Sequence, residues 1–226
     1  MTITQEAHSS VIARTCDVNE QLSFDELVAK LGEILNVSQH LDVSNIDHVQ
    51  IQALMDRYQS NEDDWSKCAL RESSRGYTRN GVVNFGDNAN LLILVWNPGK
   101  GSAIHDHAGA HCVMKILKGT LQEELFDNSD SESTQEPEKP KKMQCFDKHL
   151  MYVNQSRYIN DHIGVHRVTN KGKEPAVSLH LYTPPYAMKY GCNIFSETAG
   201  RKSHVDMSKL YSWQGKIVNK NMYSNC

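Results

Sequence analysis

Two histidines separated by one residue, His105 and His107, are the clearest candidates for chemistry in this chain. In a β-strand, residues i and i+2 point to the same face, so both imidazoles could reach one metal ion. A third histidine, His166, follows later in the segment IGVHRVTN. Ligands from an early and a late strand would suit a metal ion inside a β-barrel. Taken alone, however, the pair fits packed or exposed imidazoles equally well.

Two residues in the same stretch compete for this role. His111 has the parity of His105 and His107 only if their strand runs unbroken, and we interpret it as structural. Cys112 as a thiolate ligand would make a softer metal site, whereas a lone cysteine most often acts as a small buried hydrophobe. The candidate ligand set is therefore His105, His107 and His166.

The elements that must position these residues change in character near residue 73. Before it, the pattern predicts a helical annex over residues 23–72. Ser23 followed by Glu26 has the form of a capping box, which predicts a helix start. Two more helices are predicted from Asn45 to about Tyr58, capped by Ser44 or Asn45, and from Glu62 to about Leu70.

After residue 73, short apolar runs alternate with turn signals. The runs are NLLILVW (90–96), HCVMKIL (111–117), LMYV (150–153) and AVSLHLY (176–182). Such a series favours an all-β sandwich or barrel over alternating strands and helices. We expect a flexible tail over 1–22 and one domain over 23–226, with the barrel in 73–226. The polar segment 127–142 predicts a disordered hairpin insertion.

Composition excludes several classes of function. The chain has 226 residues, a net charge of −3 and 39% hydrophobic residues, as expected for a globular domain. Nothing in this balance indicates binding to nucleic acid or to an anionic membrane. We find neither an apolar run long enough to span a bilayer nor a signal peptide. The six cysteines are widely scattered, so we interpret them as free thiols. Free thiols are typical of a reducing compartment, which predicts a cytoplasmic protein.

The histidine pattern resembles the two motifs of the cupin family. The first motif appears as G-x5-H-x-H-x11-G between Gly99 and Gly119, and the second contains His166. This resemblance implies a jelly-roll barrel. A cupin normally adds a glutamate four or five residues beyond the second histidine, where this chain has His111 and Cys112. Three neutral imidazoles leave the full charge on a divalent metal, so an anionic ligand such as a thiolate would complete the site.

A more specific resemblance is to the cysteine dioxygenase family, over roughly residues 62–195. It is carried by GYTRN (76–80), GSAIHDHAGAHCVMKILKG (101–119), IGVHRVTN (163–170) and AVSLHLYTPP (176–185). The resemblance implies an enzyme of cysteine breakdown that oxidises the thiol of free L-cysteine with O2 to cysteine sulfinate. We expect a monomer with no macromolecular partner.

The family resemblance also implies individual roles. The positions of His105, His107 and His166 bind a single Fe(II). Arg79 grips the substrate carboxylate, which suits a guanidinium fork, and Tyr77 lines the same pocket.

A second group of implied roles involves residues of the segment AVSLHLYTPP (176–185) together with Cys112. In part of the family, the positions of Cys112 and Tyr182 form a thioether, a cofactor made from the protein itself. His180 is then a partner of the Tyr182 hydroxyl, and Ser178 orients His180. A peptide bond that is cis in the family falls at Thr183-Pro184, where a cis bond is least costly.

One departure from the family pattern concerns the pocket entrance. Vertebrate members carry a cysteine four residues after the second proline, and this chain has Lys189 there, with Cys192 three residues on.

Two alternative functions remain open from the sequence. Dioxygenases for 3-mercaptopropionate look similar but have glutamine at the position of Arg79. A non-catalytic cupin that stores a metal or a small ligand would share the fold. The full set of pocket residues argues against storage, because storage needs none of them.

Overall fold

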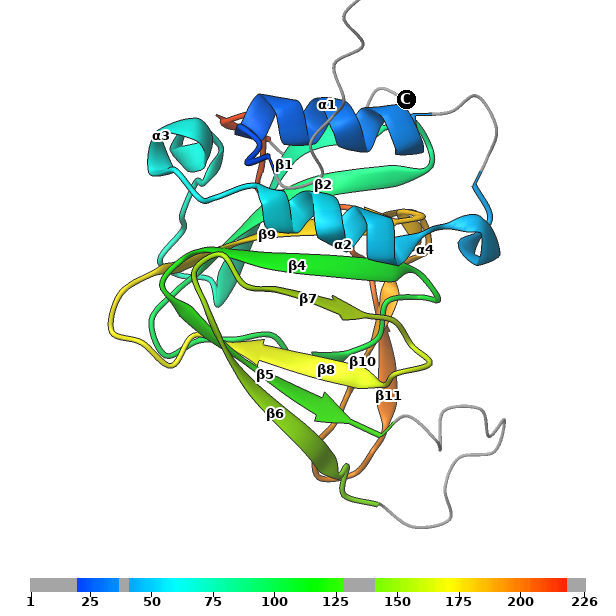
Figure 1. Ribbon diagram of the computed structural model, residues 1–226. Helices are drawn as coiled ribbons and strands as arrows, with labels where there is room; N and C mark the ends of the chain where they lie inside the picture. Colours follow the sequence, from blue (N-terminus) through cyan, green and yellow to red (C-terminus); the bar gives the residue numbers. More distant parts are fainter. Residues whose placement is uncertain (1–19, 37–40, 128–140, 219–226) are drawn as a thin grey trace, which may run out of the picture.

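The computed structural model describes residues 20–36, 41–127 and 141–218 (Figure 1). Residues 1–19, and all but the ends of the predicted insertion 127–142, lie outside this range, so their predicted flexibility stays a prediction. Within the segment expected to be a tail, Leu22 is buried and pairs with Tyr58, so the packed chain begins by this residue.

The first helix forms as its capping signal predicts. Helix α1 (Phe24–Leu35) begins after Ser23, whose hydroxyl accepts a hydrogen bond from the Glu26 amide. The Glu26 carboxylate in turn accepts from the Ser23 amide at 2.8 Å. Both halves of the capping box are therefore present.

The next two helices differ from the prediction. Helix α2 (His48–Arg57) starts after a short 3-10 turn, η1 (Val43–Asn45), because Asp47 rather than Ser44 or Asn45 supplies the capping oxygen. Helix α3 (Glu62–Trp65) ends early and continues as a 3-10 turn, η2 (Ser66–Cys68). The chain turns away there because Thr78 and Asn80 donate side-chain hydrogen bonds to the Leu70 carbonyl.

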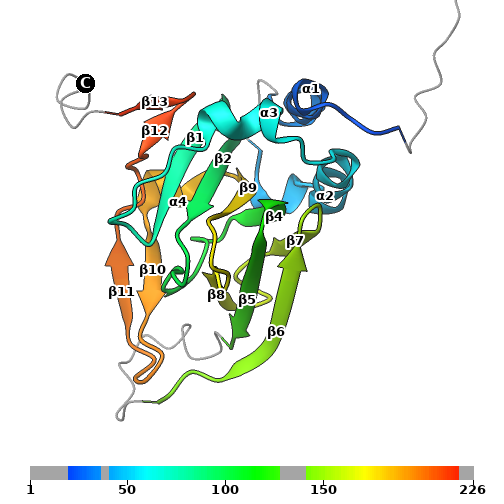
Figure 2. The same cartoon turned by 90° about the vertical axis from the view of Figure 1, so that its left-hand side faces the viewer.

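Two sheets face each other and form the barrel predicted from the sequence (Figures 1 and 2). The larger sheet has the order β13-β12-β1-β2-β9-β4-β7, and the smaller has the order β11-β10-β3-β8-β5-β6. The larger sheet consists of β1 (Tyr77–Phe85), β2 (Ala89–Trp96), β4 (His111–Lys118), β7 (Ser156–Ile159), β9 (Ala176–Thr183), β12 (Ser212–Trp213) and β13 (Lys216–Ile217). The smaller consists of β3 (Ile104–His105), β5 (Thr120–Phe126), β6 (Cys145–Tyr152), β8 (Val165–Thr169), β10 (Cys192–Phe195) and β11 (Lys202–Val205).

Strand β2 is buried on both faces, which explains its unbroken apolar run. Leu91, Ile93 and Val95 pack in the cluster that contains the residues of α1 and α2. Leu92 and Leu94 point into the barrel, where they meet residues of the smaller sheet. The helical annex therefore seals the outer face of the larger sheet and leaves the inner face to the site.

The region after residue 185, which the sequence did not place, completes the barrel. Helix α4 (Tyr186–Tyr190) leads into β10, and β10 joins β3 to β11. Strand β12 then pairs in parallel with β1. The Thr183-Pro184 bond is cis, as the resemblance implied. None of the described helices has the length and apolar character that crossing a bilayer requires.

Close packing at Gly81 ties the C-terminal strand to β1 and yields a test. A Cβ atom at Gly81 would lie 2.2 Å from Cε3 of Trp213, so we expect Gly81→Ala to lower the unfolding free energy by about 1–3 kcal/mol. Gly32→Ala is the control: its Cβ would lie 3.7 Å from Phe85 in the middle of α1, and the helix should gain up to about 1 kcal/mol. Urea denaturation of both variants measures these changes, and an unaltered Gly81→Ala protein would contradict the packing.

Candidate metal centre

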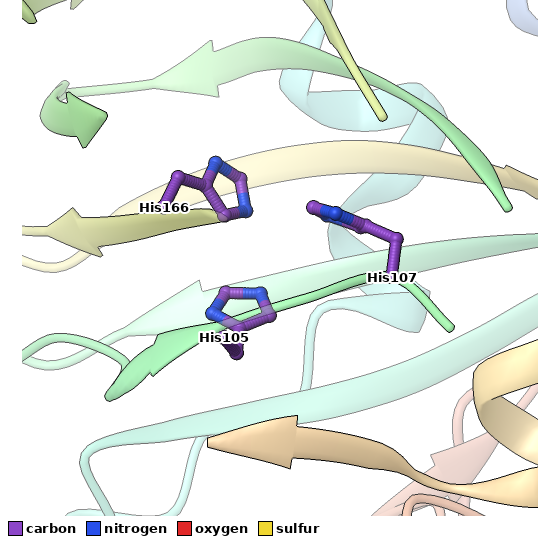
Figure 3. Close-up of side chains that lie close together, drawn as sticks. All are labelled: His105, His107 and His166. Atoms are coloured by element: carbon purple, nitrogen blue, oxygen red, sulfur yellow. The ribbon is translucent and has the colours of Figure 1, made fainter. Parts of the chain in front are cut away.

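His105, His107 and His166 converge in the barrel interior (Figure 3). Each offers one ring nitrogen, and these atoms all lie within 4.8 Å of one another. His105 and His166 are direct partners in the pairing of β3 with β8. The prediction that one strand carries both His105 and His107 was wrong, because β3 ends at His105. His107 lies in the loop that follows.

Two buried or half-buried carboxylates hold this loop in place. Asp161 accepts hydrogen bonds from the amides of His107 and Gly109, at 2.7 and 2.6 Å. On the other side, Asp106 accepts from the amide of Asn193 in β10 at 2.8 Å. These hydrogen bonds hold the loop from both sides, so that His107 faces the same point as His105 without strand pairing.

The hydrogen bonds of the rings indicate which nitrogen is left for a metal. Nδ1 of His105 lies 3.0 Å from the Ala103 carbonyl, and Nδ1 of His166 lies 2.8 Å from Oε1 of Glu123. Both acceptors require a proton on Nδ1, so Nε2 of each ring keeps its lone pair. Both ring nitrogens of His107 are buried without a hydrogen-bond partner among the described residues. Such an unpartnered imidazole fits a metal ligand.

Burial favours the uncharged form of two of these rings. It lowers the pKa of His105 and of His166 well below the ordinary range, and the neighbouring histidines lower both pKa values further. Neutral imidazole is the form that binds a metal ion. The three histidines therefore fit a divalent cation.

The larger sheet supplies the opposite wall of the same pocket. Side chains that line it together with the three histidines include Tyr77, Arg79, Trp96, His180 and Tyr182. The smaller sheet and the loop after β3 thus carry the candidate metal ligands, and the larger sheet carries the residues expected to bind and orient a substrate.

A chain of hydrogen bonds crosses the inner face of the larger sheet. Trp96 Nε1 donates to Ser178 Oγ at 2.7 Å, and Ser178 Oγ lies 2.7 Å from His180 Nε2. His180 Nδ1 lies 3.2 Å from the Tyr182 hydroxyl. Indole N–H can only donate, so Ser178 accepts from Trp96 and is free to donate to His180. Burial lowers the pKa of His180 well below its ordinary range and raises that of Tyr182. The neutral imidazole then carries its proton on Nδ1 and donates to Tyr182, whose own proton is left for the pocket.

Arg79 is anchored at the edge of this wall. Its Nη1 donates to the Met207 carbonyl in the segment between β11 and β12. Tyr77, the other predicted substrate residue, stacks on Trp96 with ring centroids 4.6 Å apart. The guanidinium therefore has a fixed position in the pocket.

The two competing residues of the ligand stretch have other partners. His111 lies 2.6 Å from the Tyr158 hydroxyl and 3.0 Å from the Val43 carbonyl, which agrees with the structural role expected for it. Cys112 lies directly opposite Tyr182 in the pairing of β4 with β9. Burial raises the pKa of its thiol, which disfavours the thiolate that a soft metal ligand would need.

The two residues named at the pocket entrance lie in different surroundings. Lys189 does not line the pocket, since its Nζ lies 3.2 Å from a carboxylate oxygen of Asp87. Cys192 does line it and is buried. Lys189 lies in α4, which ends at Tyr190, and the chain returns to the pocket at Cys192, the first residue of β10. Burial raises the pKa of the Cys192 thiol to about 11.

Sequence reasoning missed the residues that support the site. These are Asp106, Glu123, Asp161 and Met207. A signal for one of them exists in TLQEELF, where Glu123 has the parity of Leu121 and Leu125. A glutamate between two apolar residues on one strand face indicates an inward carboxylate.

A jelly-roll barrel that brings three histidines together in its interior defines a cupin-type metal-binding protein. The family described as "Cysteine dioxygenase type I" matches residues 15–198. "Cysteine dioxygenase type 1" of Danio rerio is 42% identical over 193 residues, which cover 85% of this chain and 88% of that protein. The proteins of the same description from Rattus norvegicus and Homo sapiens are 40% and 39% identical over 182 residues, covering 79% of this chain and 84% of each. The chain therefore belongs to the cysteine dioxygenase type I family and is an enzyme of that family, as the sequence predicted.

Removing one ring tests the metal centre. We expect His107→Ala to weaken Fe(II) binding by more than about 100-fold, since losing a ligand exceeds the effect of losing an outer hydrogen bond. The control is His111→Gln, which lies four residues on and should bind like the unaltered protein. Metal content after dialysis against a weak chelator measures both. Full metal content in His107→Ala would exclude this residue as a ligand.

Proposed function

We propose that this protein oxidises the thiol of free L-cysteine with O2 to cysteine sulfinate, at a single Fe(II) held by His105, His107 and His166. The observation that supports it most directly is the shared pocket, in which Arg79 faces the three histidines from the opposite sheet. A cationic fork and a metal site in one small pocket suit a thiol that carries a carboxylate.

Each of the pocket residues then has a defined role in the reaction. Iron, when bound, supplies the redox chemistry that allows O2 to react with a thiol, and both oxygen atoms go to the sulfur. Arg79 binds the substrate carboxylate and fixes the orientation of the thiol, and Met207 holds Arg79 in position. Tyr77 stacks on Trp96 and closes the side of the pocket.

Tyr182 acts at the reacting end of the substrate. The bond chain from Trp96 through Ser178 and His180 turns the Tyr182 hydroxyl proton toward the pocket. Its raised pKa keeps it protonated, so it works as a hydrogen-bond donor to the thiolate or to the oxygen that adds to sulfur. His180 and Ser178 are positioning residues for Tyr182.

We also propose that Cys112 and Tyr182 form a thioether. The two residues are directly opposite on β4 and β9, and they pack in one buried cluster. Forming this bond removes two hydrogens, which O2 can accept at the same metal site. The link would fix the ring of Tyr182 in the position that the bond chain already favours.

The setting in the cell is part of this proposal. The four described cysteines are free thiols, which supports a reducing compartment such as the cytoplasm. The substrates are small molecules, and the pocket is complete within one chain, so we propose that the protein acts as a monomer.

The carboxylate role of Arg79 gives the sharpest test of the substrate. Arg79→Gln should lower kcat/KM for cysteine by about 10- to 100-fold, because a hydrogen bond to a charged group contributes about 1.5–3 kcal/mol. Oxygen uptake and sulfinate formation, with cysteine and with 3-mercaptopropionate, measure it. The control is Arg75→Gln, since Arg75 is exposed and lies over the Tyr211 ring.

Three results would contradict the proposal. The unaltered enzyme could prefer 3-mercaptopropionate in kcat/KM, which would change the substrate. Arg79→Gln could retain full cysteine activity, which would exclude the carboxylate role. Iron-loaded protein could bind cysteine without consuming O2, which would leave a non-catalytic cupin.

The thioether predicts a change in mass and in gel mobility. After turnover with cysteine, the intact protein should lose about 2 Da and run as a doublet on a denaturing gel. Cys112→Ala should give a single band, whereas the buried Cys68, replaced by alanine, should leave the doublet unchanged. A doublet that persists in Cys112→Ala would exclude this linkage.

A further inference from the structure

A buried carboxylate, Glu123, stands directly behind one candidate metal ligand. It lies on β5 and is 1% exposed, and its Oε1 is 2.8 Å from Nδ1 of His166. We propose that Glu123 is a positioning residue of the metal centre, which fixes the ring of His166 and supplies the negative charge that three neutral imidazoles lack. This inference rests on the metal role proposed above for the three histidines.

A simple structural ion pair does not account for the geometry. The cation near Glu123 is Arg157, whose Nε lies 3.4 Å from Oε2 and whose side chain is 37% exposed. The imidazole of His166 is closer, and it is as buried as Glu123 itself. Burying a carboxylate costs several kcal/mol unless its partners compensate, so a position this close to a neutral ring calls for a reason. A cation bound on the far side of the ring supplies one.

The contact acts through the protons of His166. A carboxylate can only accept, so Nδ1 carries the proton and Nε2 presents its lone pair to the metal. A carboxylate on the outer nitrogen also makes the inner nitrogen more basic, which strengthens the metal bond.

The three candidate ligands are supported unequally. The outer nitrogen of His105 meets the neutral Ala103 carbonyl, and Nδ1 of His107 lies 3.6 Å from Oδ1 of Asp161, beyond hydrogen-bond distance. Only His166 is backed by a carboxylate at hydrogen-bond distance. Glu123 therefore replaces the glutamate that the first cupin motif lacks in this chain. It does so through His166 and not as a direct metal ligand.

The neighbouring glutamate provides a matched control. Glu124 points to the other face of β5, where its oxygens lie 2.8 Å from Nζ of Lys148 and 2.8 Å from Nε of Arg167. Both residues are buried and both have cationic partners. They differ in that only Glu123 contacts a candidate metal ligand.

The experiment compares Glu123→Gln with Glu124→Gln in the full chain. Glutamine keeps an oxygen that can accept from His166 Nδ1, so the substitution removes the charge and little of the shape. We expect Glu123→Gln to weaken binding of Fe(II) and Co(II) by about 10- to 100-fold in competition with a chelator. Glu124→Gln should stay within about twofold of the unaltered protein. The titrations contain no cysteine, so a failure here leaves the proposed dioxygenase function intact.

A conservative variant and a spectrum separate positioning from general stability. Glu123→Asp keeps the charge and should bind metal with intermediate affinity, even if the glutamine variant fails to fold. The visible absorption of bound Co(II) should shift in Glu123→Gln, because the donor strength of His166 changes, and should not shift in Glu124→Gln. Equal affinity in all the variants, or equal losses in the two glutamine variants, would overturn the proposal.

Discussion

The structure depends on three imidazoles whose ring nitrogens meet inside a barrel. Burial, and then the neighbouring histidines, lower the pKa of His105 and His166 and so favour their uncharged forms. Burial also makes misplacement costly, because a buried ring nitrogen without a partner loses its bonds to water. Every ring must therefore be held by its neighbours or by the metal. The Ala103 carbonyl and Glu123 hold two rings, and Asp161 holds the backbone that carries the third.

The two sheets present different residues to the barrel interior, and this difference follows from the alternation of side chains along each strand. On β9, Ser178, His180 and Tyr182 all face inward, so one strand carries the whole polar chain. On the facing sheet, His105 and His166 sit opposite each other on paired strands. The outer face of the larger sheet is mainly apolar, with Lys115 among its buried residues, and it packs against α1 and α2. The annex therefore contributes nothing to the chemistry directly, and it allows both faces of β2 to be buried.

The parts of this arrangement that the sequence predicted are those with a fixed spacing. The capping box at Ser23 follows from a spacing of three residues between Ser23 and Glu26. The inward face shared by His180 and Tyr182 follows from a spacing of two residues on one strand. The start of α2 was missed because several residues in a row could cap it, and only tertiary packing selects Asp47. Asp161 was missed because it accepts hydrogen bonds from backbone amides 54 and 52 residues away, and no local pattern records such partners.

Charge explains why the pocket suits one kind of substrate. A divalent metal and Arg79 bring three positive charges to a space where burial makes each unpaired charge costly. Under the proposals above, Glu123 offsets one of them from behind His166. The two that remain match a substrate with both a thiolate and a carboxylate. A thiol without a carboxylate would leave the guanidinium facing the pocket unpaired, and an amino acid without a thiol would leave the metal uncompensated. On these proposals, the missing cupin glutamate has two replacements, one built into β5 and one brought by the substrate.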